Sequence, residues 1–549
     1  MEPSISIGDH LVKRLLDLGV GHVFGIPGDY VLGFDKKLEE SRLKFVTTCD
    51  EQGAGFAADA YARLNGLGAV CITYCVGGLK VTNTTAQAYA EKSPVVIISG
   101  SPGMGERYKH PLLHHMVKDF DTQLKVFQEL TIASTVLDDP QTACQEIDRV
   151  LSAAVRYKRP VYIELPRDMV DRSVVAAKSG FEEEEYSSDP HVLDEALAEA
   201  VEMINAAKRP VIIAGVEMHR FGLRDQLVRL LEKTNIPVAS TILSKSVVDE
   251  CNLLYMGIYE GSMGPEVVQE YVESSDCLIL LGTFMTDLNL GMYTAHLDPD
   301  RTICVTSEKL SIRYHNYENV LLRDFIQGLI EAKVERRPSE QIPHPEPIAP
   351  FSAVPRRKMT VKRVFQGLNA FLADESVIIA DTGDALFGGV DLVLGCDTYF
   401  LSPAYYASLG FAVPAAVGAS FAVPSRRPLL VLVGDGAFQM TGMELSTVAK
   451  YDLNPIILVL NNSSYGTERP ILDGSFNDLH PWSYSLLPEI FGGGKGFLVE
   501  TEDEFEAALR AAREDTDGFC LLEIILDPHD ISPALQRLTA SLAERVRPR

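Results

Sequence analysis

The sequence has no long hydrophobic run. Its 549 residues contain no uninterrupted apolar stretch of the roughly 18–20 residues that a membrane-spanning helix needs. Runs such as 95–99 and 455–460 have the length of single buried strands. Residues 1–5 also lack the basic segment that precedes the apolar part of a secretory signal. These absences lead us to expect a cytoplasmic protein.

Basic residues are in the minority. The chain has 50 Lys and Arg against 76 Asp and Glu, which gives a net charge of −26 at pH 7. A charge of this sign repels nucleic-acid phosphates and anionic membranes, so we expect neither as a partner. An anionic ligand can bind only where a local positive feature offsets the overall charge.

Cysteines are few and scattered. There are nine of them, and the pair Cys71 and Cys75 has no second pair nearby, so a zinc site is not expected. A cytoplasmic protein keeps its thiols reduced, and we therefore expect reduced cysteines in the core.

Short apolar runs alternate with segments of helical periodicity along most of the chain, as in parallel α/β sheets. A helix is expected at 51–65 and another at 192–207. The expected buried strands are 20–24, 44–47, 69–74, 95–99, 161–164, 210–214, 236–239, 277–281, 302–305, 377–380, 429–433, 455–460 and 519–525. The fold class is therefore α/β.

Two segments separate this pattern into blocks. Residues 181–190 are acidic and serine-containing, and residues 336–355 contain six prolines, as solvated and extended linkers do. We expect three consecutive parallel-sheet α/β domains at 1–180, 190–335 and 356–549. The central block has no glycine-rich dinucleotide loop, so a structural or regulatory role is expected for it.

The most informative motif is Gly434-Asp435-Gly436 at the end of one predicted strand, with Asn462 at the end of the next. Asp435 and Asn462 are 27 residues apart, which is a natural length for strand, helix and strand. Both ends then lie at the same edge of a parallel sheet, with a helix expected over 443–449. A carboxylate and a carboxamide oxygen suit Mg²⁺, and glycine amides can approach a diphosphate. The alternative is a plain glycine turn with a strand-end asparagine, which the spacing disfavours.

With this motif the sequence resembles the thiamine diphosphate-dependent 2-keto acid decarboxylases, the family of pyruvate, indolepyruvate and phenylpyruvate decarboxylases. The resemblance runs essentially end to end, from the FGIPGD segment at 24–29 to beyond Glu468. It implies a pyrimidine-binding, a middle and a diphosphate-binding domain, with thiamine diphosphate and Mg²⁺ as cofactors. Asp435, Asn462 and the main-chain carbonyl of Ser464 would hold the metal. Many members have glycine where Ser464 stands, which a main-chain ligand tolerates.

The resemblance also assigns cofactor contacts. Glu51 alone would be a helix-start carboxylate, but it matches the glutamate that hydrogen-bonds N1′ of the aminopyrimidine. Leu409 matches the side chain that keeps the cofactor bent, and Ala407 would offer its carbonyl to the 4′-amino group. The remaining expected cofactor contacts are Thr382, Asp384, Ala385, Gly434, Gly436, Ala437 and Tyr465.

Four residues match the proton-transfer groups of the decarboxylases: Asp29, His114, His115 and Glu468. Taken singly they would be a turn aspartate, a surface histidine pair and an acid before a helix starting at Pro470. Decarboxylation followed by aldehyde release requires several proton transfers around one small cavity. Their joint presence therefore indicates a lyase.

Pyruvate-specific relatives narrow the substrate pocket with bulky side chains. The positions that match here are Leu288, Leu386 and Thr467, with Ile471 nearby and Thr382 in the same pocket. Three of them are smaller than the bulky versions, so we expect a substrate larger than pyruvate, either aromatic or branched and medium-chain.

The family also implies a homodimer or homotetramer with active sites at subunit interfaces. Asp29, Glu51 and the histidines would come from one subunit, and the metal ligands with Glu468 from its partner.

Two alternatives stay open. A carboligase of the acetohydroxyacid synthase type uses the same scaffold, but the histidine pair and Glu468 belong to the decarboxylase pattern. A catalytically inactive cofactor-binding regulator is disfavoured because the set of catalytic side chains is complete.

Overall fold

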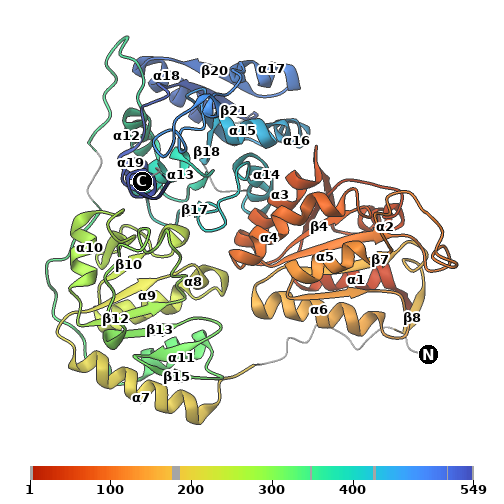
Figure 1. Cartoon of the computed structure of the whole chain (residues 1–549), viewed down its shortest axis with the longest axis horizontal. Helices are drawn as coiled ribbons and strands as arrows, with labels where there is room; N and C mark the ends of the chain where they lie inside the picture. Colours follow the sequence, from red (N-terminus) through yellow and green to blue (C-terminus); the bar gives the residue numbers. More distant parts are fainter. Residues whose placement is uncertain (1–3, 176–185, 346–348, 425–427, 516, 547–549) are drawn as a thin grey trace. The chain divides into compact units, whose positions relative to one another are not determined.

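The structure, a computed structural model, describes residues 4–175, 186–345, 349–424, 428–515 and 517–546 (Figure 1). The chain forms two compact units, each made of several segments. The first unit comprises Met1–Glu185, Tyr406–Ser425 and Thr441–Asn454, and the second unit comprises Tyr186–Tyr405, Arg426–Met440 and Pro455–Arg549. Half of the predicted linker at 181–190 lies outside the described residues.

A six-stranded parallel sheet forms the centre of the first unit, in the order β3-β2-β4-β5-β7-β6. A short antiparallel pair, β1 with β8, lies apart from it. The strands are β1 (Ser4–Ser6), β2 (His22–Gly25), β3 (Lys44–Thr47), β4 (Gly68–Ile72), β5 (Val95–Ser101), β6 (Ala133–Val136), β7 (Val161–Pro166) and β8 (Ser173–Val175).

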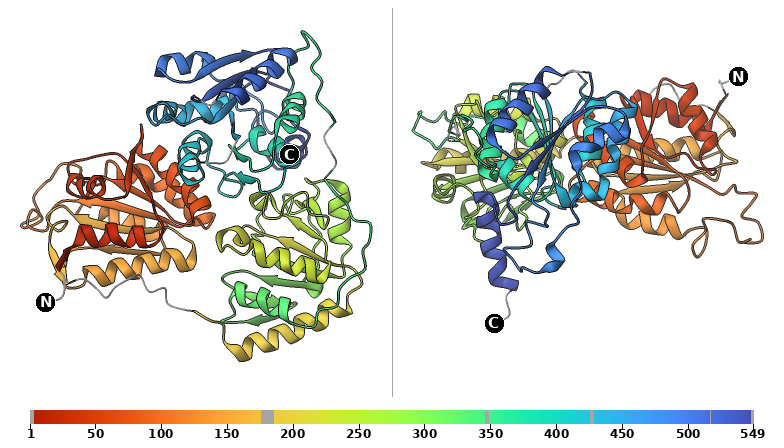
Figure 2. Two further views of the ribbon diagram at one scale, coloured as in Figure 1. Left: turned by 180° about the vertical axis from the view of Figure 1, so that it is seen from behind. Right: turned by 90° about the horizontal axis from the view of Figure 1, so that it is seen from above.

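Helices cover both faces of this sheet (Figures 1 and 2). Successive strand residues point to opposite faces, and the apolar side chains on each face are buried by the helices that cover it. Val96 and Ile98 share one core with α1 (Ile7–Asp17), α2 (Leu32–Glu40) and α6 (Ala143–Tyr157). On the other face, rings of the sheet contact α3 and α5. The helices of this face are α3 (Glu51–Asn65), η1 (Gly78–Val81), α4 (Thr82–Ala90) and α5 (Thr122–Leu130).

Two later segments complete the first unit around α3. They contain α14 (Ala412–Ala422), η4 (Gly442–Glu444) and α16 (Leu445–Lys450). α14 packs so closely on α3 that a Cβ at Gly418 would overlap the carbonyl oxygen of Ala57. Small residues on α3 permit this approach. The helix ends at Asn65, and the next residue, Gly66, has a φ of 93°, which favours glycine.

The second unit contains two sheets. One has the order β11-β10-β9-β12-β13-β14-β15, with its last two strands antiparallel, and the other is the parallel sheet β17-β16-β18-β19-β21-β20. The strands of the first are β9 (Pro210–Ala214), β10 (Val238–Ser240), β11 (Tyr255–Ile258), β12 (Cys277–Leu281), β13 (Thr302–Val305), β14 (Leu310–Ile312) and β15 (His315–Tyr317). Those of the second are β16 (Val377–Ala380), β17 (Tyr399–Leu401), β18 (Leu429–Gly434), β19 (Ile456–Asn461), β20 (Lys495–Val499) and β21 (Cys520–Ile525).

Helices flank both sheets of the second unit (Figure 1). Those of its first half are α7 (Pro190–Ala206), α8 (Glu217–Arg220), α9 (Arg224–Thr234), η2 (Ile242–Ser244), α10 (Glu266–Glu273), η3 (Pro299–Arg301) and α11 (Leu322–Glu331). Those of its second half are α12 (Val361–Phe371), α13 (Asp384–Val390), α15 (Asp435–Thr441), η5 (Ser475–Asn477), η6 (Tyr484–Leu486), α17 (Leu487–Phe491), α18 (Glu502–Glu514) and α19 (Pro533–Val546). Ile242, Ile258 and Met263, which follow or end strands of the first sheet, join the core of the second sheet.

The predicted α/β class and the parallel sheets are confirmed, and several strands have the predicted bounds. The predicted helix over 443–449 needs correction. The helix expected over 443–449 is split between η4 and α16, and α15 begins earlier, at Asp435 itself. The two antiparallel strands β14 and β15 were not predicted, because each is only three residues long.

The expectation of reduced core cysteines is wrong in part. Cys251 and Cys396 form a disulfide, and Cys49 is an exposed thiol. Two hydrogen bonds from backbone amides to carboxylates connect the disulfide segments, since Oδ1 of Asp249 accepts from the amide of Asp397 and Oε2 of Glu250 accepts from that of Leu394. The Cα atoms of the two cysteines are then 6.1 Å apart, which is within the usual range for a disulfide.

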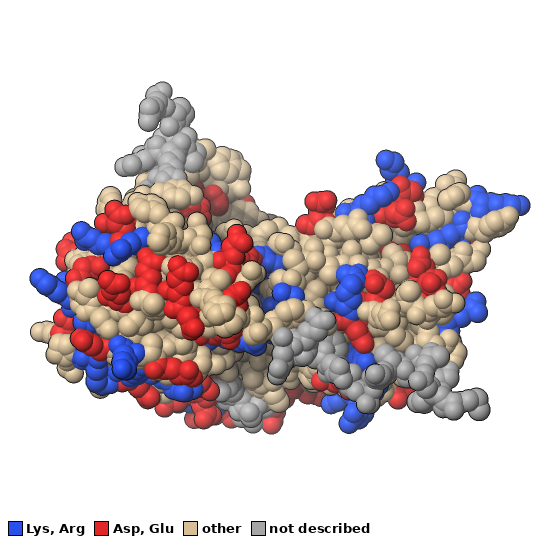
Figure 3. All heavy atoms as spheres, turned by 90° about the horizontal axis from the view of Figure 1, so that it is seen from below, with Lys and Arg blue, Asp and Glu red and all other residues tan. Residues whose placement is uncertain are grey.

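The surface carries charges of both signs. In the face shown in Figure 3, basic and acidic side chains are interspersed, and acidic ones gather over the left part. Among the described residues, no helix combines the length and the apolar character needed to cross a bilayer.

Candidate active site

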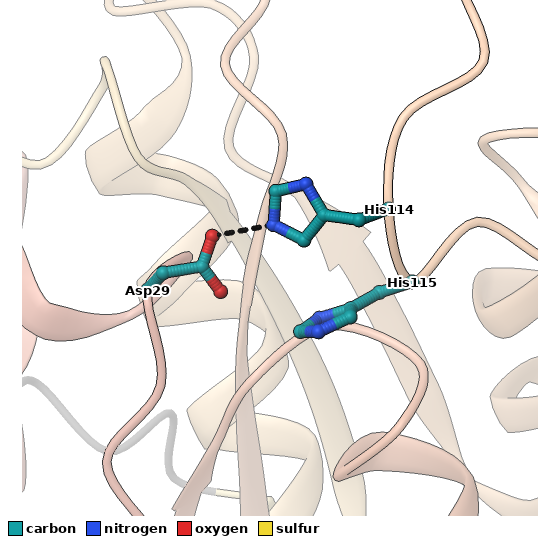
Figure 4. Close-up of side chains that lie close together, drawn as sticks. All are labelled: Asp29, His114 and His115. Atoms are coloured by element: carbon teal, nitrogen blue, oxygen red, sulfur yellow. Dashed lines mark hydrogen bonds and ion pairs between the residues drawn. The ribbon is translucent and has the colours of Figure 1, made fainter.

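A cluster of titratable side chains lies in the first unit, beyond the end of β2. Asp29 is in the turn after β2, and His114 and His115 are in the connection between β5 and α5. Oδ2 of Asp29 lies 2.7 Å from Nε2 of His114, and the two side chains point toward one another (Figure 4). The turn approaches the loop after β4 so closely that a Cβ at Gly28 would overlap the side chain of Thr73. The predicted grouping of Asp29 with the histidine pair is therefore present in the structure.

Tyr30 packs against both histidines. Its ring stacks on His114 with centroids 4.8 Å apart and meets His115 edge-on at 5.6 Å. Its hydroxyl lies 3.3 Å from Nδ1 of His114. Nδ1 of His115 is buried and has no hydrogen-bond partner in the described part of the chain. Ligand atoms of Asp29, His114 and His115 lie within 4.8 Å of one another, a spacing that suits proton transfer and could also hold a metal ion.

An arginine borders this cluster. Nη1 of Arg167 lies 3.9 Å from Oδ2 of Asp29, and its guanidinium lies 5.0 Å from the centroid of the Tyr30 ring. Nε of Arg167 donates to Oε2 of Glu106 at 2.8 Å. This hydrogen bond raises the pKa of Arg167 and lowers the pKa of Glu106, so both stay charged. A permanent cation therefore lies beside the Asp29 carboxylate.

Glu51 is the first residue of α3 and is largely buried. The preceding Asp50 caps the helix by accepting from the amide of Gln52 at 2.8 Å. Nζ of Lys80 donates to Oε2 of Glu51 at 2.7 Å and also contacts Asp50. The carboxylate is thus fixed at a helix N-terminus, where the helix dipole favours negative charge.

A second acid holds the segment before α3. Glu444, at the end of η4, accepts from the amides of Cys49 at 3.1 Å and Asp50 at 3.0 Å. Burial raises the pKa of Glu444. This residue is almost 400 positions away in the sequence, and it positions the turn that leads into Glu51.

The predicted metal ligands lie at one edge of the last sheet. Asp435 starts α15 directly after β18, and Asn462 follows β19, its parallel neighbour. Oδ1 of Asp435 accepts from the amide of Gly436 at 3.0 Å, whereas Oδ2 is buried without a partner among the described residues. Burial raises the pKa of Asp435 to about 7. An unpaired buried carboxylate oxygen fits a cation.

The loop after β19 folds back over this edge. A Cβ at Gly436 would lie 2.7 Å from the ring of Tyr465, and one at Gly466 would lie 2.7 Å from Nδ2 of Asn462. The amide of Ser464 donates to Oδ1 of Asn462 at 3.1 Å. Glycine at 436 and 466 therefore allows the loop and the start of α15 to meet, as a diphosphate site needs.

Thr382, Asp384 and Ala385 lie where β16 passes into α13. Oγ1 of Thr382 is buried without a partner among the described residues. Gly383 has a φ of 107°, which favours glycine, and a Cβ there would lie 3.3 Å from Oγ1 of Thr467. This loop therefore meets the one that contains Thr467. The carboxylate of Asp384 is already used, because it accepts from the amide of Ser532 at 3.1 Å.

The other predicted residues have varied surroundings. Glu468 is exposed in a run of turns, and the helix expected to begin at Pro470 is absent there. Ile471 is half-buried in the same turns. Leu386 is buried in the core of the last sheet, and Leu288 packs against that core. Three predicted cofactor contacts remain. Ala407 has a φ of 59°, and Leu409, two residues later, is half-buried. Ala437 is buried.

The sequence did not indicate Tyr30, Lys80, Arg167 or Glu444. Each acts through a neighbour distant in the sequence, and no local pattern marks such a pair. Tyr30 could have been found, because it directly follows Asp29.

Comparison with known proteins agrees with this geometry. Family profiles of thiamine pyrophosphate enzymes match in three parts: the N-terminal TPP binding domain at 5–125, the central domain at 197–329 and the C-terminal TPP binding domain at 392–524. The chain is 36% identical to the indole-3-pyruvate decarboxylase of Azospirillum brasilense, and the match covers 97% of each chain. It is 34% identical to the alpha-keto-acid decarboxylase of Mycolicibacterium paratuberculosis over 98% of this chain and 96% of that one. The corresponding protein of Mycobacterium leprae is 32% identical with the same coverage.

Proposed function

The chain belongs to the thiamine diphosphate-dependent 2-keto acid decarboxylases, and we propose that it uses Mg²⁺ to convert a 2-keto acid larger than pyruvate to an aldehyde and CO₂. Thiamine diphosphate, when bound, supplies the electron sink that decarboxylation needs. The protein's part is to hold the cofactor, exclude water and move protons.

The residues that would hold the metal and diphosphate are those at the edge of the last sheet. The unpartnered Oδ2 of Asp435 supports a cation at this edge, with the side chain of Asn462 and the carbonyl of Ser464 as the further oxygen ligands. The free hydroxyl of Thr382 suits a diphosphate oxygen or the substrate carboxylate. Glu51, held at the start of α3, would bind the aminopyrimidine N1′.

Proton transfer is assigned to Asp29, His114, His115 and Glu468. When Nε2 of His114 carries a proton, it donates to Asp29 at 2.7 Å, and Nδ1 then accepts from the Tyr30 hydroxyl at 3.3 Å. Asp29 thus selects one tautomer of His114. His115, with a free Nδ1, is available to exchange a proton with substrate.

The contact between Asp29 and His114 is the observation that carries the proposal, because it joins two of the four residues assigned to proton transfer. The test is a panel of 2-keto acids with thiamine diphosphate and Mg²⁺, in which aldehyde and CO₂ are measured. Free aldehyde is expected, and an acyloin as the main product would indicate the carboligase instead.

The substrate preference rests on side-chain size and on one relative. Leu288, Leu386 and Thr467 replace bulkier side chains of pyruvate-specific enzymes, and the relative from Azospirillum brasilense is named for an indolyl substrate. We therefore expect kcat/KM to be higher for phenylpyruvate, indolepyruvate or a branched keto acid than for pyruvate. Pyruvate as the best substrate of the panel would overturn this preference.

The proposal also includes a homodimer or homotetramer in the cytoplasm, with each active site shared between subunits. Mixing an Asp29→Asn chain with an Asp435→Asn chain tests it. Shared sites predict that hybrid dimers regain activity that neither parent has. Full activity of a monomer would exclude this arrangement.

A further inference from the structure

A cavity of about 400 Å³ lies within the second unit, and none of the residues assigned to catalysis or cofactor binding is in its described wall. Its wall includes β11, the start of α10, the end of α13 and one side chain of α19. Much of the wall is apolar, with Tyr255, Met256, Ile258, Val268 and Leu392 contributing. Its volume is within the range of small-molecule sites.

Two of the charged groups in the wall neutralise each other. Nζ of Lys245 lies 2.6 Å from Oε1 of Glu250, and each side chain is only 2% exposed. Lys245 also donates to the carbonyl of Leu392 at 2.8 Å, and Oε2 of Glu250 accepts from the amide of Leu394 at 3.0 Å. This pair is fully hydrogen-bonded and needs no ligand.

Glu260 is different, because it lines the cavity at 3% exposure and its carboxyl has no hydrogen-bond partner among the described residues. Burial and, to a smaller extent, the nearby Asp391 raise its pKa to about 8, although Arg537 and Lys245 oppose the shift. Asp391 also lines the cavity, and burial raises its pKa as well. A carboxyl that lines a cavity without a protein partner can accept a hydrogen bond from a ligand there.

The other cation of the described wall, Arg537, already makes one hydrogen bond. Nε of Arg537 donates to the carbonyl of Met263. With Lys245 and Glu250 paired, three acids of the described wall (Glu260, Glu266 and Asp391) remain against the guanidinium of Arg537. The described wall therefore carries two uncompensated negative charges when all its acids are ionised and His344 is neutral. A carboxylate ligand, including a keto acid, would meet net repulsion here.

From this geometry we propose that the cavity is a binding site for a small organic monoamine, whose ammonium group donates to Glu260 and whose apolar body packs against β11 and α10. The ammonium supplies a positive charge among the acids of the wall and donates hydrogen bonds to Glu260. The apolar part of the wall packs against an aromatic or aliphatic chain. The site is independent of the decarboxylation proposed above, since it shares no residue with the assigned catalytic and cofactor-binding set.

Three ligands with a similar apolar body separate the effect of the ammonium group from that of the aromatic ring. They are 2-phenylethylamine, 2-phenylethanol and 3-phenylpropanoate, each titrated calorimetrically into the full-length protein. The amine is expected to bind at least about tenfold more tightly than the alcohol or the acid, because only it forms a charge-assisted hydrogen bond. Equal or tighter binding of the acid, or no binding of the amine, would overturn the proposal.

Variants and pH then test the named contact. Glu260→Gln should weaken amine binding about tenfold or more, whereas Glu270→Gln, an exposed acid of α10 outside the cavity wall, should not change it. Circular dichroism checks the fold of both variants. In the unmodified protein, amine binding should tighten about tenfold between pH 7 and pH 9 as Glu260 ionises. Affinity that is independent of pH and of Glu260 would exclude this site.

Discussion

Oδ2 of Asp29 lies 2.7 Å from Nε2 of His114, although the two residues are 85 positions apart. The contact joins the turn after β2 to the connection before α5, and Tyr30 packs against its histidine. The pair can share a proton directly, so removing either member removes the function of both.

We expect Asp29→Asn and His114→Gln each to lower kcat by roughly 10²–10⁴-fold, the range for loss of a general acid or base. The double variant should be little worse than the single ones, because coupled residues are not additive. Steady-state kinetics with the best keto acid measures both. His110→Gln, an exposed histidine of the same loop, is the matched control. Additive losses would contradict a shared proton.

Arg167 should act on the rate through Asp29. Its guanidinium lies 3.9 Å from the Asp29 carboxylate. In Arg167→Met the carboxylate loses this cation, so the acid limb of the kcat/KM profile should move to higher pH. Arg167→Lys keeps a positive charge and should therefore shift the acid limb less than Arg167→Met does. Arg172→Met, at an exposed position, should not shift it. An unshifted profile with a uniformly lower rate would mean that Arg167 has only a structural role.

Glu51 should be essential for activity, whereas the neighbouring Asp50 should not be. Both Asp50 and Glu51 contact Lys80, so each substitution removes one partner of the same lysine. Glu51→Gln should lower activity by roughly 10²-fold or more while the protein stays folded. Asp50→Asn keeps the helix cap and should retain most of the activity. Similar losses in the two variants would indicate that the acids act only through Lys80.

Glu260 should make stability depend on pH. Its pKa is about 8 in the folded protein, above the ordinary value of 4.5. Between these two values the folded state keeps a proton that the unfolded state has lost, so this residue lowers stability as pH rises, by roughly 1.4 kcal/mol per pH unit at most. The Tm of Glu260→Gln should therefore exceed that of the unmodified protein more at pH 9 than at pH 5. Differential scanning calorimetry, with Glu270→Gln as control, measures this. A constant difference would mean that Glu260 titrates normally.

Buried strands were predictable from the sequence because each is a short apolar run. β9, β12, β13 and β16 have the predicted bounds, and α3 has the predicted length. The start of α15 was harder to predict. It begins at Asp435, directly after β18, whereas the sequence pattern indicated a helix only from 443.

The grouping of Asp29 with His114 and His115 was predictable from the sequence, but the side chains that surround this group and Glu51 were not. Lys80, Arg167 and Glu444 reach their partners from distant segments, and only the folded chain brings these side chains together. The disulfide between Cys251 and Cys396 was missed for the same reason, because 145 positions separate the two cysteines.

The close approach of Gly418 on α14 to Ala57 on α3 limits how this protein can be recombined with its relatives. The two helices lie in one compact unit, yet more than 300 residues separate them in the sequence. A chimera that exchanges residues 1–185 alone would pair a foreign α3 with the native α14, and the close contact at Gly418 leaves no room for an α3 backbone that lies nearer to α14. Crossover points for gene shuffling must therefore transfer 406–425 and 441–454 together with the N-terminal segment.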